Sequence, residues 1–435
     1  MFIKQMIKRI LPKSLYSVLK KIKTFFKDKF LIIKYNRVQK KLLKIQKSLK
    51  EKQKLSVGFY VVYDSSWGAR PLYEKMQGDS SFFTKIVVCP DVARGIENEK
   101  QVLNQVYERL SKKYGSENVL LSYDNKQKKY IDYSDLFDII NLSNPYDEMT
   151  VEFYQVKYLN SKNKLCFYNS YGYQGKLRYD IDLMKSDTFN LFWRLFVDNQ
   201  STKEIAINEQ YIKGKNVIVS GCCKMDDFHI TTETKDNSSR YVRTVIIAPH
   251  HTVDQSNLNL SNFLLYADFF KELPLRYPQI KFIFRPHPLL FTKLRREDFW
   301  GEKKVSEYIE QITSNKNLVY STEGEYFDVF NESDALIDDC GSFLAEYFYT
   351  GKPQCYMLRS KEQFDTEYLD FGKKFFDYVY KAFSKEDIIH FIDDVVLNKN
   401  DPLKDSRLSF AKKEVMINYP DVSDFIIKYF KELMK

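Results

Sequence analysis

The sequence has few of the features that mark non-globular or membrane-spanning chains. Only 14 of the 435 residues are glycine, which excludes a collagen-like protein. No uninterrupted apolar run reaches the roughly 18 residues of a spanning helix, and the mean hydropathy is −0.45. Hydrophobic residues make up 44% and charged residues 29%, which excludes disorder as the main state. The length predicts two or three domains.

The six cysteines do not form a disulfide or metal-binding pattern. No Cys-x-x-Cys pair occurs, and the adjacent Cys222 and Cys223 have an awkward geometry for a mutual disulfide. We therefore expect a reduced, cytoplasmic protein in which each cysteine is a small buried apolar residue. There is also no Walker phosphate loop and no paired acidic triplet, so we expect no metal and no cofactor.

The basic charge is concentrated at the N-terminus. Residues 1–54 contain 18 Lys or Arg and two acids, Asp28 and Glu51, while the rest of the chain is mildly acidic. Apolar residues recur at helical spacing on both sides of Pro12, with lysines on the opposite face. The pattern predicts two basic amphipathic helices separated by the proline.

A basic amphipathic arm is typical of a protein that binds a polyanionic surface. We expect residues 1–54 to lie in the plane of a membrane, with apolar side chains in the acyl boundary and lysines on anionic headgroups. A helix packed on the rest of the protein, or on a partner chain, is the alternative. Nucleic acid is not the expected partner, because it would leave the apolar stripe without a function.

From residue 55 onward, short apolar runs alternate with helical segments in two series. This alternation predicts two parallel sheets with helices on both faces. Expected strands of the first series are Leu55–Tyr63, Ile86–Cys89, Val119–Ser122, Leu136–Leu142, Leu165–Asn169 and Val217–Ser220. Those of the second are Thr244–Ala248, Lys281–Phe284, Leu318–Tyr320, Ala335–Ile337 and Gln354–Met357.

The polar stretch 231–240 between the two series is typical of an interdomain linker. The predicted fold is α/β of GT-B type, with two doubly wound Rossmann-like domains that face a cleft. An acceptor domain would span residues 55–230 and a nucleotide-donor domain residues 241–400. Residues 401–435 would form helices that pack across both domains. Ligands of such sheets bind beyond the carboxyl ends of the strands.

Two loops of the second series place histidines directly after strands. The first is Pro249-His250-His251-Thr252, and the second is Arg285-Pro286-His287-Pro288. Flanking prolines hold His287 on a rigid backbone, and the Arg285 cation favours its neutral form, which can act as a base or donate to a phosphate. The spacing of the three histidines matches no standard metal-ligand pattern.

A third loop, Asp338-Asp339-Cys340-Gly341-Ser342, precedes a predicted helix over 342–350. Gly341 would allow close approach of a ligand, and Ser342 would cap a helix whose free amides form a phosphate site. Glu346, one turn further on, could take ribose hydroxyls. An ordinary capped helix is the alternative for this motif.

Acceptor-side candidates come from the first series. Tyr171 and Gly172 follow the strand at Leu165–Asn169, and Arg178 lies in the basic stretch after them. Lys224 and Asp226 belong to the segment Gly221–Asp226 after the last strand of the series. We expect these residues near the mouth of the cleft, with ordinary surface turns as the alternative.

The ordered set of motifs resembles the CDP-glycerol glycerophosphotransferase family, the teichoic acid and capsule polymerases of GT-B fold. It consists of APHHT, SNF, FRPHPLL and DDCGSFLAEYFYTGKP, preceded by GCCKMD. The resemblance covers roughly residues 165–360. It departs from the family where a first-domain histidine is expected, because this segment is Asn169-Ser170-Tyr171-Gly172, and where His250-His251-Thr252 replaces a T-W-R-D-type loop.

The resemblance implies a peripheral enzyme at the cytoplasmic face of the membrane. Such an enzyme moves a phosphopolyol from a CDP-activated donor to a glycan or lipid-linked acceptor and releases CMP. By the same resemblance, His287 is the catalytic histidine, and Gly341 and Ser342 hold the donor phosphates. The expected donor-binding set is Arg285, His251, Thr252, Asp339, Gly341, Ser342 and Glu346. His250 competes with His287 for the role of base.

The sequence is also compatible with two other functions. One is a GT-B glycosyltransferase that uses a nucleotide sugar in capsule or lipopolysaccharide synthesis. The other is a non-catalytic scaffold at the membrane surface, which the missing first-domain histidine would allow.

Overall fold

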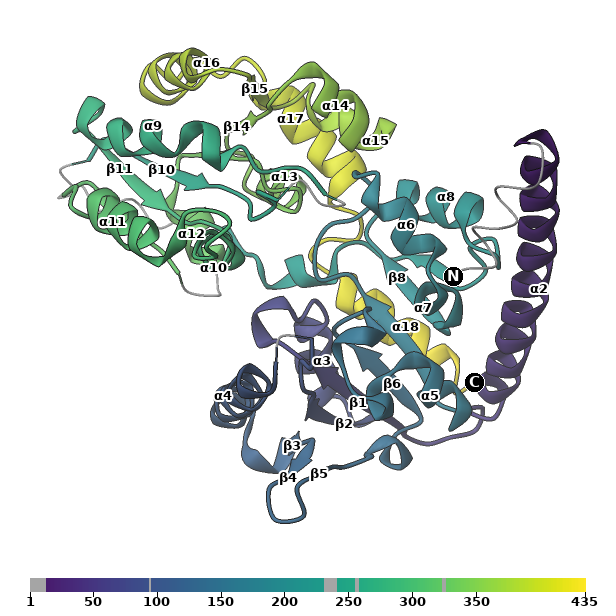
Figure 1. Ribbon diagram of the computed structural model, residues 1–435. Helices are drawn as coiled ribbons and strands as arrows, with labels where there is room; N and C mark the ends of the chain where they lie inside the picture. Colours follow the sequence, from purple (N-terminus) through teal and green to yellow (C-terminus); the bar gives the residue numbers. More distant parts are fainter. Residues whose placement is uncertain (1–12, 94, 231–240, 255–257, 323–325) are drawn as a thin grey trace.

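The computed structural model describes residues 13–93, 95–230, 241–254, 258–322 and 326–435. These residues form two α/β domains, and a long helix, α2 (Lys13–Lys47), lies along the side of the first one (Figure 1). The expected linker at 231–240 and the expected first helix of the arm, within residues 1–12, lie outside the described residues. In the part of the chain that is described, no helix is long and apolar enough to cross a membrane.

The first domain contains a seven-stranded parallel sheet in the order β3-β2-β1-β6-β7-β8-β9. Its helices cover both faces of the sheet. The strands are β1 (Leu55–Val61), β2 (Phe82–Val88), β3 (Val119–Leu121), β6 (Ile139–Leu142), β7 (Leu165–Asn169), β8 (Arg194–Val197) and β9 (Val217–Val219). The helices are α3 (Arg70–Gln77), α4 (Ile96–Tyr114), α5 (Val156–Ser161), α6 (Tyr179–Lys185), α7 (Asp187–Leu191) and α8 (Gln200–Glu209).

The second domain has a six-stranded parallel sheet in the order β12-β11-β10-β13-β14-β15. The strands are β10 (Arg243–Ala248), β11 (Ile280–Phe284), β12 (Leu318–Tyr320), β13 (Ala335–Asp338), β14 (Gln354–Met357) and β15 (Tyr380–Ala382). The helices are α9 (Phe263–Arg276), α10 (Leu289–Leu294), α11 (Gly301–Thr313), α12 (Phe327–Glu332), α13 (Phe343–Glu346), α14 (Lys361–Glu367), α15 (Asp370–Phe375) and α16 (Lys385–His390).

Both sheets start from a central strand and run outward in two directions, as doubly wound folds do. The order reverses between β1 and β6 in the first sheet and between β10 and β13 in the second. Central strands such as β6, β7 and β13 are buried along their whole length. This explains their continuous apolar runs, because a parallel sheet covered on both faces exposes neither side.

The C-terminal segment returns from the second domain to the first. Helix α17 (Lys404–Phe410) packs on the second domain, where Phe410 meets Phe375 and stacks on Tyr378. The final helix α18 (Val422–Glu432) lies under the first sheet (Figure 1). There Phe430 contacts Phe167 and Trp193 in the first-domain core.

The element boundaries differ from the expectations at several points. Strand β2 begins at Phe82, four residues before the expected start, and β6 begins at Ile139 because a 3₁₀ turn occupies Ser134–Leu136. Strands β8 and β15 were not expected. The helix expected over 342–350 is only one short turn, α13, followed by a 3₁₀ turn at Tyr347–Thr350.

Helix α2 is docked along only part of its length. In its second half, Tyr35 is fully buried and stacks on Tyr211, and the Gln39 amide donates to the Asn190 and Phe192 carbonyls. From Val18 to Ile33, large apolar side chains point to solvent. They are Val18, Ile22, Phe25, Phe26, Phe30, Ile32 and Ile33, which are 41% to 66% exposed. We call this set the apolar face of α2.

Candidate active site

The histidine loops meet at the carboxyl edge of the second sheet. Strands β10 and β11 are parallel neighbours, so the loops after Ala248 and Phe284 leave the sheet side by side. The His287 amide donates to the Pro249 carbonyl at 2.9 Å, and this bond ties the two loops together. The pattern therefore brings three histidines to one place, next to the β10–β13 reversal where ligands of such folds bind.

The three imidazoles form one cluster. Their ring centroids are 4.4 Å apart for His250 and His251, 5.2 Å for His250 and His287, and 4.1 Å for His251 and His287. One ligand atom from each lies within 4.8 Å of the others, a spacing at which the three could hold a metal ion. His250 is buried, whereas His251 and His287 are partly exposed.

Hydrogen bonds set the tautomers of two of these rings. The Leu289 amide donates to His287 Nδ1 at 3.1 Å, so the proton of the neutral ring is on Nε2. Thr252 Oγ1 accepts from the Leu260 and Ser261 amides, which leaves its own hydrogen to donate to His250 Nδ1 at 3.0 Å. Both rings therefore carry Nε2–H. In these tautomers both rings can donate from Nε2 to an anion.

Burial keeps His250 neutral. Its pKa lies well below the usual value because the ring is buried and because His251, His287 and Lys293 are nearby. The folded state therefore does not take up a proton at pH values where the unfolded chain does. Stability contributed by the neutral ring is present above the unfolded pKa of about 6.5 and is lost as pH falls below it.

We expect His250→Gln, which does not titrate, to reduce the loss of stability between pH 7.5 and pH 5.5. The two proteins should differ in this loss of unfolding free energy by about 1 kcal/mol. Each pH unit below the pKa of the unfolded chain lowers the free energy of unfolding of the parent protein by about 1.4 kcal/mol. Denaturant unfolding at the two pH values measures it. His390→Gln on the exposed end of α16 is the matched control and should leave the pH dependence unchanged. Equal pH dependence of stability in His250→Gln and the parent protein would contradict the conclusion that burial keeps His250 neutral.

Asp339 holds the histidine loop from behind. It is fully buried, and its carboxylate accepts from the His250 amide at 2.6 Å and from the Asn262 amide at the start of α9. Burial raises its pKa to about 7, and the two amide bonds oppose this effect. Asp339, expected among the donor-binding residues, therefore joins the end of β13 to the loop of His250 and to the start of α9.

Two cations from different domains approach the same aromatic ring. The Lys224 ammonium lies 4.7 Å from the Tyr326 ring centroid, and the Arg285 guanidinium lies 5.9 Å from it. Arg285 also donates to Ser321 Oγ at 2.6 Å, and Lys224 donates to the Tyr171 carbonyl at 3.3 Å. A small pocket beside them is lined by first-domain residues, among them Arg70 and Asp227, and by Tyr326 and Phe327 of the second domain. Arg70 is neutralised by Asp227 at 2.9 Å, while Lys224 and Arg285 approach the cleft from the two domains.

The third loop meets the first domain at Gly172. A Cβ at Gly172 would lie 2.7 Å from Ser342 Oγ, so a larger residue there would require the Ser342 side chain to move. A Cβ at Gly341 would lie 2.9 Å from Leu177 Cδ1 and 3.2 Å from Leu260 Cδ1. Ser342 is in the αR conformation and makes no side-chain capping bond, unlike the expected helix cap. The motif builds a close contact between domains instead.

Four further candidates have structural partners. Glu346 is fully buried and accepts from the Tyr326 hydroxyl. Arg178 donates to the Thr366 carbonyl at 2.7 Å and braces the first domain against the second. Asp226 is buried and accepts from the amides of Val422 and Ser423, so it fixes the start of α18. Tyr171 is 36% exposed, and its hydroxyl lies 3.3 Å from that of Tyr146.

Two more residues shape the site: Tyr326, which no sequence pattern indicated, and Lys176, which belongs to the basic stretch expected on the acceptor side. Tyr326 lies in a segment between β12 and α12, and its role depends on packing between domains. Lys176 is fully buried, and burial lowers its pKa although Asp180, Asp198 and Glu346 oppose this shift. Its backbone carbonyl accepts from the Leu369 amide at 2.8 Å and joins the domains. The basic character of the 176–178 stretch was the available signal.

Two doubly wound parallel sheets, with the histidine cluster at the carboxyl edge of the second, define an enzyme of GT-B type. The family described as CDP-Glycerol:Poly(glycerophosphate) glycerophosphotransferase matches residues 183–423, more than half of the chain. The chain therefore belongs to this family and is a CDP-glycerol glycerophosphotransferase-like transferase. No curated protein shows significant sequence similarity to it.

Solved structures support the fold. The UDP-GlcNAc 2-epimerase from Neisseria meningitidis bound to UDP-GlcNAc matches with a TM-score of 0.53 at 13% identity, over 87% of this chain and 99% of that chain. The S. aureus MnaA–UDP structure matches with 0.53 at 14% identity, over 88% and 98%. The wall teichoic acid polymerase TagF matches with 0.50 at 12% identity, over 94% and 98%. At these identities the likeness shows the fold alone.

Proposed function

We propose that the protein transfers glycerol phosphate, or a similar phosphopolyol, from a CDP-activated donor to a cell-surface glycan or lipid-linked acceptor. Membership of the family supports the reaction class. The observation that carries the proposal is the cluster of His250, His251 and His287 beside Arg285, because it offers ring N–H donors and positive charge where a pyrophosphate would bind.

The chemistry requires positioning and charge neutralisation. An acceptor hydroxyl attacks the β-phosphorus, a new P–O bond forms, the bond to the CMP oxygen breaks, and the hydroxyl proton passes to the released CMP or to solvent. Catalysis therefore depends mainly on placing the reactants and stabilising the negative charge on the transferred and departing phosphates. The Nε2–H groups of His287 and His250 donate to phosphate oxygens, and Arg285 and Lys224 neutralise the departing CMP. His251, next to His287, completes the donor-binding side.

The acceptor would enter from the first domain. Tyr171 and Gly172 lie on the loop after β7, and Lys224 reaches this loop through the Tyr171 carbonyl. The proposed location is the cytoplasmic face of the membrane, with the apolar face of α2 in the lipid and its lysines on anionic headgroups. No nucleic-acid partner is part of this proposal.

A donor screen tests the proposed function. CMP release is measured with CDP-glycerol, CDP-ribitol and common UDP-sugars in the presence of a membrane fraction as acceptor. We expect turnover with a CDP-polyol. Turnover of a UDP-sugar alone would establish a glycosyltransferase instead, and binding without turnover of any donor would favour a scaffold.

We expect Ser342→Asp to weaken CDP-glycerol binding by about tenfold, because it adds a negative charge where the donor phosphates are proposed to lie. Ser342→Asn has a similar shape without the charge and is the matched control. Gly341→Val should also weaken binding, since its side chain would press on Leu177 and Leu260. Titration calorimetry measures all three, and equal affinity in Ser342→Asp and Ser342→Asn would place the donor elsewhere.

A further inference from the structure

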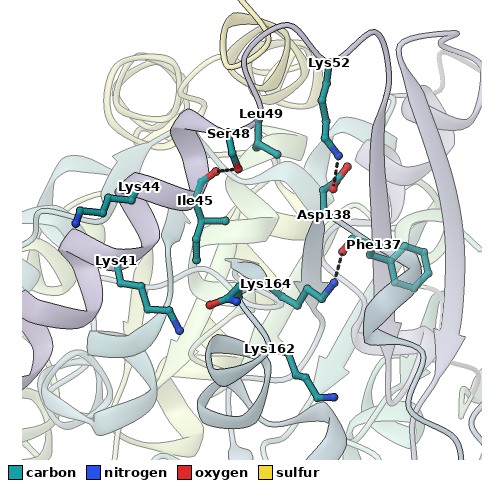
Figure 2. Close-up of a pocket in the computed structure, with 11 residues that line it drawn as sticks. Lys41, Lys44, Ile45, Ser48, Leu49, Lys52, Phe137, Asp138, Lys162 and Lys164 are labelled. Carbon is teal, nitrogen blue, oxygen red and sulfur yellow. Dashed lines mark hydrogen bonds and ion pairs between the residues drawn. The ribbon is translucent and has the colours of Figure 1, made fainter.

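A second pocket lies at the edge of the first sheet where β6 and β7 begin, and Figure 2 shows the residues that line it. Its volume is about 520 Å³. It is lined by the end of α2 and by residues just before β6 and β7, namely Lys41, Lys44, Ile45, Ser48, Leu49, Lys52, Phe137, Asp138, Lys162, Asn163 and Lys164. None of them falls within residues 183–423, the part of the chain that matches the family.

Its lining is strongly cationic. Five lysines face one carboxylate, Asp138, which lies 2.6 Å from the Lys52 ammonium. Two acids outside the lining partly offset the charge, since Asp132 is 3.9 Å from Lys162 and Asp135 is 3.7 Å from Lys164. The local balance stays positive, and like charges gathered around a cavity favour an anionic occupant.

Two of the ammonium groups are held in place by neutral partners. Lys41 donates to the Asn160 carbonyl at 3.0 Å, and Lys164 donates to the Phe137 carbonyl at 3.1 Å. The Lys164 side chain is only 15% exposed. An ammonium has three N–H donors, so one bond to a carbonyl fixes the group and leaves donors for a ligand. This preorganisation reduces the entropy lost on binding.

We propose that this pocket binds a phosphate ester. Several ammonium groups around one space suit a group with multiple anionic oxygens. The volume is in the range of small-molecule sites and leaves room for an organic group attached to the phosphate. Ile45, Leu49 and Phe137 provide apolar surface for that group.

The phosphate has two possible sources, a phospholipid headgroup or a soluble phosphodiester. Helix α2 connects the pocket to its own apolar face, which is where a lipid would be expected. Two probes separate the sources. Dihexanoyl phosphatidylglycerol is a soluble lipid, and glycerophosphoglycerol carries the same headgroup without acyl chains.

The test measures binding of both probes to the full-length protein by titration calorimetry. Lys44→Glu/Lys162→Glu changes two exposed lining residues and should weaken binding by on the order of tenfold or more. Lys40→Glu/Lys157→Glu makes the same charge change at exposed positions outside the lining and is the matched control. We expect it to change affinity less than about twofold, because exposed charges at a distance are screened.

The outcomes are distinct. Weakening confined to the pocket variant supports the site. If both probes bind, the pocket is a phosphodiester site, and if only the lipid binds, the acyl chains contribute and the pocket is a phospholipid site. Equal weakening in both double variants would show non-specific attraction and overturn the proposal, as would absence of binding to the parent protein. Donor turnover at the cleft does not enter the measurement.

Discussion

His287→Ala is expected to reduce turnover by about 10²- to 10³-fold, the range for loss of one donor to a developing anion. The ring lies within 4.1 Å of His251 and presents Nε2–H, because the Leu289 amide occupies Nδ1. CMP release from CDP-glycerol at saturating donor measures the effect. Donor affinity should change much less than turnover.

The tautomer makes a second variant informative. In His287→Gln the side-chain amide can place an N–H near the position of Nε2, so we expect about tenfold more activity than in His287→Ala. A general base would not be rescued in this way, because a glutamine amide does not accept a proton. Equal activity of the two variants would therefore favour the base role. Near-normal turnover in His287→Ala would remove His287 from the catalytic residues altogether.

The fold of both domains could be predicted from the sequence because buried parallel strands have a plain signature. Leu165–Asn169, Leu318–Tyr320 and Gln354–Met357 have the predicted bounds, since each is a short apolar run between helical segments. Strand β8 was hidden because it follows Phe192 and Trp193 in one dense apolar stretch. Within that stretch the spacing of apolar residues does not change from helical to strand-like, so the start of β8 is not visible in the sequence.

The candidate site was predictable where it depends on strand order and not where it depends on packing. The meeting of His250, His251 and His287 follows from two loops at neighbouring parallel strands. The interpretation of Ser342 as a helix cap was wrong, because α13 has only four residues and Ser342 already has helical backbone angles. A cap requires a non-helical residue with a side-chain bond to the first turn.

Membrane binding is expected to depend on the apolar face of α2. In Phe25→Ser/Phe26→Ser/Phe30→Ser, three side chains that are 54%, 65% and 66% exposed lose their aromatic rings. Each buried phenylalanine is worth about 1.5–3 kcal/mol, so affinity for anionic vesicles should fall by on the order of 100-fold or more. Sedimentation with phosphatidylglycerol vesicles measures it. The fold should be unaffected, because α2 is held to the first domain by other residues, namely Asp28, which accepts from the Tyr211 hydroxyl, and Leu31 and Tyr35, which pack on the core.

The control must remove equally exposed apolar side chains elsewhere. Leu264→Ser/Leu265→Ser/Leu275→Ser on α9 changes residues that are 45%, 59% and 74% exposed. We expect it to sediment like the parent protein, since α9 carries no comparable cluster of lysines. High salt should weaken binding of the parent by screening the lysines of α2 while the apolar contribution persists. If both triple variants lost vesicle binding equally, non-specific adsorption of exposed apolar side chains would explain the binding of the parent protein. If neither did, the apolar face of α2 would instead be a docking surface for another protein.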